Sequence, residues 1–198
     1  MARTIAKDHD AKRDRILATA ARVFAETGFD RASMSQLARE CGISKANIYH
    51  YYDSKDALLY DILDSYLSDL RDRIAAIDGT GMTPEDHLRA VVLEVLMAYR
   101  GADDEHRVQI GGMAALPSEQ QKVLRDYQKD LVAQVATIVQ ALAPDVFGSD
   151  KAKLRAATMS LFGMLNWFYM WNHDDSDAAR EAYAALVSNL MLKGVRGL

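Results

Sequence analysis

The fold is decided by residues 33–52, which read SMSQLARECGISKANIYHYY. Ser33 is followed three residues later by Gln36, the spacing of a helix-capping box, and Gly42 suits the left-handed turn that ends a short helix. Two residues further on, Ser44 can cap another short helix over about residues 45–52. The stretch therefore predicts two short helices joined by a tight turn, the shape of a helix-turn-helix.

A longer helix is predicted before this pair, over about residues 10–27. Its apolar residues Ile16, Ala20 and Phe24 recur every four positions, and Gly28 ends it. We expect them to pack against the inward-facing residues of the helix pair, which are Leu37, Ala38, Ile43, Ile48 and Tyr52. The outward positions of the last short helix, which suit phosphates and base edges, are then Lys45, Ala46, Asn47, Tyr49 and His50. From spacing alone, a plain three-helix corner of an all-α protein is an equal alternative.

The rest of the chain also predicts helices, because caps and breakers recur and no strand-like alternation does. Further helices are expected over about residues 55–77, 84–100, 103–113, 118–142, 150–172 and 176–193. The expected fold class is therefore all-α, with nine helices in two domains. We place the N-terminal helix-turn-helix domain at residues 1–54 and the second domain at residues 55–198, with helix 55–77 connecting them.

Composition and motifs exclude several classes of protein. With 198 residues, 49% of them apolar and 26% charged, the chain resembles neither a collagen, a disulfide scaffold nor a disordered protein. Cys41 is the single cysteine and the first fifteen residues hold no apolar stretch, so a reducing, cytoplasmic location is expected. There is no Gly-rich phosphate loop, no paired-cysteine motif and no metal spacing among the five histidines. We expect no enzyme activity, no metal and no cofactor.

The charge is unevenly distributed. The net charge is −4, but residues 1–60 hold ten Lys and Arg against eight Asp and Glu, and the remainder holds fourteen against twenty. A mildly basic head therefore precedes an acidic body.

Five stretches carry a family resemblance: ILATAA (16–21), FAETGF (24–29), SMSQLA (33–38), CGIS (41–44) and IYHYYDSKDAL (48–58). Together, over about residues 12–60 and without a gap, they resemble the N-terminal domain of TetR/AcrR-type transcriptional regulators. The departures are Ala46, Tyr51 and Tyr52, where Gly, His and Phe are usual. The added Tyr52 hydroxyl needs a hydrogen-bond partner or water.

The resemblance implies contacts with double-stranded DNA by Ser33, Ser35, Lys45, Ala46, Asn47, Tyr49, His50 and Lys55. The two serines would bond phosphates, residues 45–47 would meet base edges in the major groove, and Lys55 would anchor a phosphate at a helix N-terminus. Lys7, Lys12 and Arg13 are further candidates for phosphate contacts. Because one head offers few phosphate contacts, we expect a homodimer on a palindromic operator with half-sites about 34–36 Å apart.

Residues 156–171, AATMSLFGMLNWFYMW, are apolar almost all the way round, which a helix with one wet face could not be. The run is shorter than the roughly 20 residues that span a bilayer, so we expect no membrane role. Burial on two sides, against its own domain and a partner subunit, is the better account, and Gly163 would permit close approach. In TetR-type proteins the last two helices form a four-helix bundle across the twofold axis, which implies an interface of Phe162, Leu165, Tyr169, Tyr183, Leu186, Val187 and Leu190.

The resemblance also implies an effector cavity, for which we expect a lining of Met97, Arg100, Met113, Tyr127, Met164, Trp167, Phe168 and Trp171. Plain core packing is the alternative for any one of them. Residues 163–171 look like the corresponding helix of catabolic regulators that respond to acyl-CoA thioesters. Cations for the phosphates of such an effector would come from Arg100, His106, Arg107, Lys122 or Arg125.

The expected function is that of a ligand-responsive repressor, released from its operator when a small apolar effector changes the pose of helix 55–77. The alternative is an architectural or division-linked DNA-binding protein on the same fold, which ignores small molecules.

Overall fold

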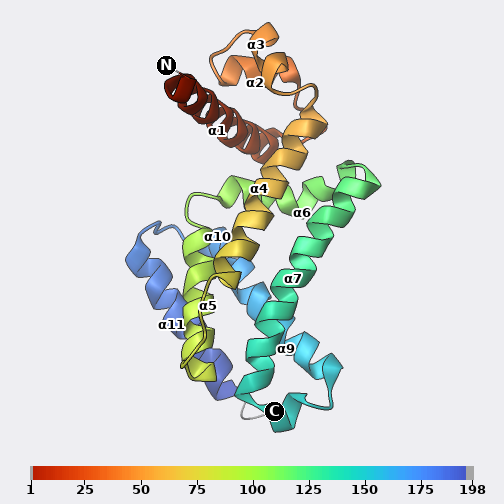
Figure 1. Ribbon diagram of the computed structural model, residues 1–198. Helices are drawn as coiled ribbons and strands as arrows, with labels where there is room; N and C mark the ends of the chain where they lie inside the picture. The colour runs from red at the N-terminus through yellow and green to blue at the C-terminus, as the bar shows by residue number, and fades with distance from the viewer. Residues whose placement is uncertain (1, 195–198) are drawn as a thin grey trace. The chain divides into compact units, whose positions relative to one another are not determined.

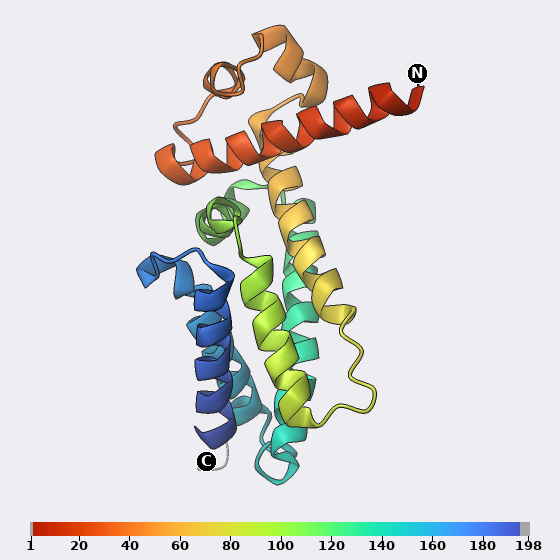
Figure 2. The same cartoon turned by 90° about the vertical axis from the view of Figure 1, so that its left-hand side faces the viewer.

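A computed structural model describes the backbone of residues 2–194 and the side chains of residues 9–194, and within this range every regular element is helical (Figure 1, Figure 2). The elements are α1 (Ala2–Thr27), α2 (Met34–Glu40), α3 (Lys45–Tyr51), α4 (Lys55–Ala75), α5 (Pro84–Ala98), α6 (Asp103–Gly112), the 3-10 turn η1 (Met113–Ala115), α7 (Ser118–Leu142), α8 (Pro144–Phe147), α9 (Lys151–Asn166), α10 (Phe168–Trp171) and α11 (Asp177–Gly194). The all-α prediction is confirmed.

The local signals of the helix-turn-helix are confirmed. The Ser33 hydroxyl oxygen accepts from the backbone N–H of Gln36 at 3.2 Å, and that of Ser44 accepts from the N–H of Asn47 at 3.1 Å. Gly42 has a φ of +69°, the left-handed conformation in which a side chain would be strained. The two serines therefore cap the starts of α2 and α3, and Gly42 follows the end of α2, as the sequence predicts.

Two helix boundaries differ from the predictions. The helix α1 begins at Ala2 instead of near residue 10. The predicted helix over 150–172 is divided at Trp167 into α9 and α10, and the Asn166 side chain there accepts a hydrogen bond from the Tyr99 hydroxyl at 2.7 Å. The single turn α8, which begins with Pro144 and buries Phe147, was also not expected from the sequence. The short helices α8 and α10 each bury one aromatic residue, Phe147 and Phe168. Such tertiary packing cannot be predicted from helical periodicity in the sequence.

Packing divides the chain into two compact units. The first contains the residues up to Leu67 together with Gly101–Arg125, and the second contains Ser68–Arg100 and the residues from Asp126 on. The helices α4 and α7 therefore contribute residues to both units. Packing of this kind does not establish which part folds alone, so the domain boundary between residues 54 and 55 stays a prediction.

The core of the first unit is the predicted one. Its side chains from α1, α2 and α3 are buried: Ile16, Ala20, Phe24, Leu37, Ala38, Ile48 and Tyr52. Ile43, in the turn, is half-buried. Cys41 is buried as well, and this burial raises the pKa of its thiol, which fits a packing role.

The Tyr52 hydroxyl has a hydrogen-bond partner in the folded chain. It donates to Asp61 Oδ2 at 2.5 Å, and Arg13 Nη2 lies 2.6 Å from both carboxylate oxygens of Asp61. Burial raises the pKa of Tyr52, and the hydrogen bond to Asp61 raises it further. The cluster ties the residue that ends α3 to α1 and to α4.

The second unit is built on α5 and α11, which pack side by side, with α9 against both (Figure 2). Its most buried residues are aliphatic, among them Leu88, Val92, Val139, Leu161 and Val187. Arg180 is buried too, with 3% of its surface exposed. Its guanidinium donates to the carbonyl of Leu96 in the last turn of α5 and lies over the Phe168 ring. A cation at this position is stabilised by the negative end of the α5 helix dipole.

No helix within residues 2–194 is both long and apolar enough to cross a membrane. Among the side chains that the structure describes, no group of three or more His, Cys, Asp or Glu is placed to hold a metal ion.

We expect Tyr52→Phe to lower the free energy of unfolding by about 1–2 kcal/mol, because it removes a hydrogen bond to a charged group. Chemical denaturation of both proteins measures the change, and Tyr51→Phe, at a half-buried neighbouring tyrosine, is the matched control. Because the pKa of Tyr52 is raised in the folded protein, its contribution is fully present below about pH 10 and is lost as the pH rises above that value. Equal stability of Tyr52→Phe and wild type at neutral pH would contradict the assigned role of the hydroxyl.

Candidate nucleic-acid interface

The helix α3 presents one polar face to solvent. Ile48 is fully buried, and this fixes the rotation of the seven-residue helix about its axis. All five predicted reading residues, Lys45, Ala46, Asn47, Tyr49 and His50, are exposed. The Lys45 ammonium lies 6.0 Å from the centre of the Tyr49 ring. The exposed face therefore offers one cation, one amide, one phenol and one imidazole to a partner.

The start of α2 supplies two hydroxyl groups beside this face. Ser33 and Ser35 are both exposed. The Ser33 oxygen is occupied as a helix-cap acceptor, but its proton is still available for donation to a phosphate oxygen. The structure thus leaves both serines able to act as predicted.

Lys55 is placed differently from the prediction. Its ammonium donates to three backbone carbonyls, of Phe29 at 2.9 Å, Asp30 at 3.2 Å and Ala32 at 3.4 Å. It also lies 4.4 Å from the centre of the Phe29 ring. The side chain therefore holds the α1–α2 loop to the start of α4, and a phosphate would have to compete with these contacts.

Two aromatic contacts at the end of α3 were missed by sequence reasoning. The Tyr51 ring lies 4.9 Å from the ring of His9 on α1 and 5.6 Å from that of His50. These contacts restrict the His50 ring beside the reading face. The substitution of the usual His by Tyr51 was the visible signal, but its partner on α1 could not be inferred from spacing.

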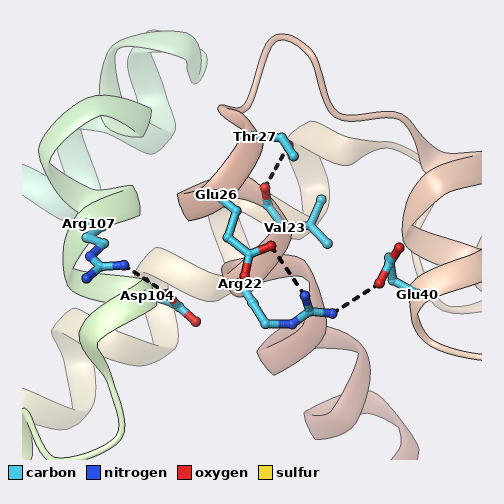
Figure 3. A network of polar contacts seen from close by, with 7 residues as sticks. All are labelled: Arg22, Val23, Glu26, Thr27, Glu40, Asp104 and Arg107. Carbon is cyan, nitrogen blue, oxygen red and sulfur yellow. Dashed lines mark hydrogen bonds and ion pairs between the residues drawn. The ribbon is translucent and has the colours of Figure 1, made fainter.

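The predicted phosphate contacts from α1 are not equally available. The guanidinium of Arg13 is held by Asp61 and the residue is half-buried, while Lys12 has a larger fraction of its surface exposed to solvent. The side chain of Lys7 lies outside the described residues. Arg22 bridges Glu26 of its own helix and Glu40 of α2 (Figure 3), so it joins helices within the head.

Two family models match this chain. Residues 16–62 match bacterial regulatory proteins of the tetR family, and residues 81–195 match the tetracyclin repressor-like C-terminal domain, which by itself is more than half of the chain. The chain belongs to the TetR family.

Relatives of this TetR-family chain include solved structures and curated proteins. A TetR-family transcriptional regulator from Bordetella parapertussis 12822 is 33% identical and has a TM-score of 0.85, over 94% of this chain and 96% of that one. The transcriptional repressor KstR2 of Rhodococcus jostii is 30% identical over 95 residues, which are 48% of this chain and 45% of KstR2. The structure of AibR in complex with isovaleryl coenzyme A and operator DNA shares the fold, with a TM-score of 0.73 and 22% identity over 91% of this chain and 98% of that one.

The matches to the first curated relatives span only about a quarter to a half of those proteins' length, for example 25% of the regulator YuxN of Bacillus subtilis. These relatives are described as transcriptional regulators or repressors.

The predicted effector residues of this TetR-family chain belong to two different units. Met113 belongs to the first unit, and the other seven belong to the second. Phe168 is buried and stacks on Tyr183 at 4.7 Å, whereas Trp167 and Trp171 are 57% and 50% exposed. Met97, Tyr127 and Met164 are half-buried. A lining role for the two tryptophans is therefore not visible in the single chain.

At least four of the candidate cations for an effector already make polar contacts. Arg107 pairs with Asp104, and Arg125 donates to Gln121. Arg100 is exposed, and its Nη1 lies 2.7 Å from Asp177. His106 is buried, and its Nδ1 lies 2.8 Å from the Tyr66 hydroxyl oxygen, so it has almost no surface to offer a ligand. The prediction for His106 is corrected for this reason.

Part of the predicted interface is already buried within one chain. Leu165 and Val187 are 2% and 0% exposed within one chain, and Phe162 is buried as well, so a partner could gain little area from them. The exposed residues of α9 are on another face, which includes Met159 and Gly163. Of the other predicted interface residues, Leu186 and Leu190 are exposed, and Tyr169 and Tyr183 are half-buried.

We expect Lys55→Met to lower the free energy of unfolding by about 1–3 kcal/mol, because three loop carbonyls lose a charged donor. Lys45→Met, at an exposed lysine of α3, is the control and should leave stability unchanged within about 0.5 kcal/mol. Chemical denaturation compares the two. If Lys55→Met were as stable as wild type but reduced the salt dependence of DNA binding, Lys55 would instead be a phosphate contact.

Proposed function

We propose that this chain is a homodimeric, ligand-responsive repressor that binds a palindromic operator through α3. The observation that carries the proposal is the geometry of α3, whose fully buried Ile48 leaves Lys45, Asn47 and Tyr49 exposed together. An asparagine at such a position can bond an adenine edge with both ends of its amide, and lysine and tyrosine can bond phosphates or bases.

The low positive charge of the reading face is the reason to expect two copies of the chain on one operator. The reading face of α3 has a single lysine, and affinity for DNA grows with the number of phosphates that a protein neutralises. Two heads on one operator double that number, provided that their α3 helices match half-sites about 34–36 Å apart.

The second unit has a surface that suits dimerisation. Six large apolar residues of α9, α10, α11 and the junction between α9 and α10 are each 44–57% exposed: Met159, Trp167, Met170, Trp171, Leu186 and Leu190. Exposed residues of this size on neighbouring elements mark association surfaces in soluble proteins. Gly163 on the exposed face of α9 has nothing within 4 Å of the position of a Cβ atom, which leaves room for another helix. We propose these residues as the dimer surface.

We propose an apolar effector, an acyl-CoA or a related catabolic intermediate. Support comes from proteins of similar structure: AibR was solved with isovaleryl coenzyme A and operator DNA, and KstR2 of Mycobacterium tuberculosis is a ketosteroid transcriptional regulator. In this chain the half-buried Met97, Tyr127 and Met164 remain the candidates for its lining. These methionines can adapt their shape to an apolar ligand.

Release would follow from a change in α4, which starts at Lys55 in the first unit and ends in the second. A ligand that favours one pose of α4 changes the separation of the two α3 helices of the dimer. Switching the operator from mostly occupied to mostly free needs a preference for that pose of several kcal/mol.

The function is tested with operator DNA selected from a random double-stranded library. We expect an inverted repeat to be enriched, and Asn47→Ala to weaken binding to it by about 1–3 kcal/mol per half-site in fluorescence anisotropy. Gln140→Ala, an exposed amide on α7 in the second unit, is the matched control and should bind as wild type does. Enrichment of no sequence, or equal binding by Asn47→Ala, would refute α3 as the reading helix.

The dimer surface is tested by Leu186→Glu, which places a charge on α11 among the exposed apolar residues. We expect native mass spectrometry to show wild type as a dimer and Leu186→Glu as largely monomer. Met82→Glu, at an exposed methionine between α4 and α5, is the control and should remain dimeric. The same spectra reveal any co-purified thioester. A dimeric Leu186→Glu would place the interface elsewhere.

A further inference from the structure

A cleft of about 450 Å³ lies inside the first unit. Its lining includes none of the residues assigned above to DNA or to the apolar effector cavity, and of the candidate effector cations it includes Arg107. One wall is the end of α1 and the loop that follows it, and the other is α6 and η1. The residues that matter for its chemistry are Phe24, Phe29, Arg31, Arg107, Gly111 and Ala115. Its volume falls within the range of small-molecule sites.

Two arginines from opposite walls line this cleft. Arg31 comes from the α1–α2 loop, where its Nε donates to the Thr27 carbonyl at 2.6 Å. Arg107 comes from α6, where it pairs with Asp104 at 3.8 Å (Figure 3). Each guanidinium is charged and has five N–H donors, so each can bind an anion in competition with its present partners. Asp30 also lines the cleft, which leaves a net positive charge on its walls.

The remaining surface of the cleft is apolar and open. The rings of Phe24 and Phe29 pack edge to face at 5.3 Å. On the α6 side, Gly111 has nothing within 4 Å of the position that a Cβ atom would take. A ligand can therefore place an apolar group against the rings and the glycine backbone while its charged end meets the arginines.

We infer that this cleft binds an organic anion with a small apolar body, a carboxylate or a phosphate monoester. Arg107 and Arg31 would hold the anionic group from the two walls. This site is additional to the effector cavity of the proposed function and does not require it.

A ligand here would act on the start of the helix-turn-helix. The loop that forms one wall offers its Phe29, Asp30 and Ala32 carbonyls to Lys55, and Ala32 is followed directly by Ser33, the N-cap of α2. A ligand that contacts Arg31 would therefore change the position of the loop that leads into the N-cap of α2. Occupancy of the cleft changes DNA affinity through this loop.

The test is a titration of deuterated, ¹⁵N-labelled full-length protein, followed by the backbone amide signals of Gly28, Gly111 and Gly112. The probes are hexanoate and phenyl phosphate, with hexan-1-ol and phenol as their neutral analogues. We expect saturable shifts of these three signals with at least one anion, and at least about tenfold weaker binding of its neutral analogue. The two anions distinguish a carboxylate site from a phosphate site.

The double variant Arg31→Gln/Arg107→Gln should weaken binding of that anion at least about tenfold. Arg39→Gln, at an exposed arginine of α2 outside the cleft, is the control and should bind as wild type does. Gly111→Val fills the open side of the cleft and should weaken binding without the loss of a charge. Absence of shifts with both anions, equal binding of the neutral analogues, or unchanged binding by the double variant would each overturn the inference.

Binding and DNA readouts separate this inference from the proposed function. The glycine signals report the cleft whether or not the protein binds an operator. Once an operator is selected, the anion that binds should change the affinity of wild type for it and leave that of the double variant unchanged. If the anion binds but operator affinity does not move, the regulatory role of the site is refuted.

Discussion

The burial of one apolar residue, Ile48, is the constraint on which the DNA-binding head depends. A seven-residue helix is not stable by itself in water, so α3 exists because it packs against α2 and buries Ile48. Successive residues of a helix are turned by about 100°, so a shift of register by one residue would bury Asn47 or Tyr49 and expose Ile48. The same contact that stabilises α3 therefore selects which side chains face outward.

Polar contacts then fix the position of this helix pair within the first unit. Lys55 gathers three carbonyls of the α1–α2 loop, and Asp61 joins Tyr52 at the end of α3 to Arg13 of α1. Both contacts involve α4, which continues into the second unit. A change in the pose of α4 would shift the start of α2 and the end of α3 together, so the helix pair would move as one body.

The first sixty residues could be predicted well because their signals are local: caps at Ser33 and Ser44, a left-handed Gly42 and an apolar stripe with one wet side. The sequence was ambiguous where a residue has two plausible environments. Lys55 suits a phosphate or a set of carbonyls equally well, and only the folded loop shows which lies near. In α9 both sides are apolar, so periodicity could not show that Leu165 faces the core while Met159 and Trp167 face outward.

The exposed apolar residues of the second unit and the low positive charge of α3 are complementary features of the proposed dimer. Six of the large apolar residues that are exposed lie in the segment from α9 to α11, in the second unit. A head whose reading helix has a single lysine gains affinity chiefly by being paired with a second head, and pairing makes affinity depend on the distance between them. A more basic head would bind DNA over a range of spacings. In the proposed dimer, modest charge on α3 and an apolar dimer surface together would make DNA binding sensitive to small movements of α4, which is what the proposed ligand-controlled repressor requires.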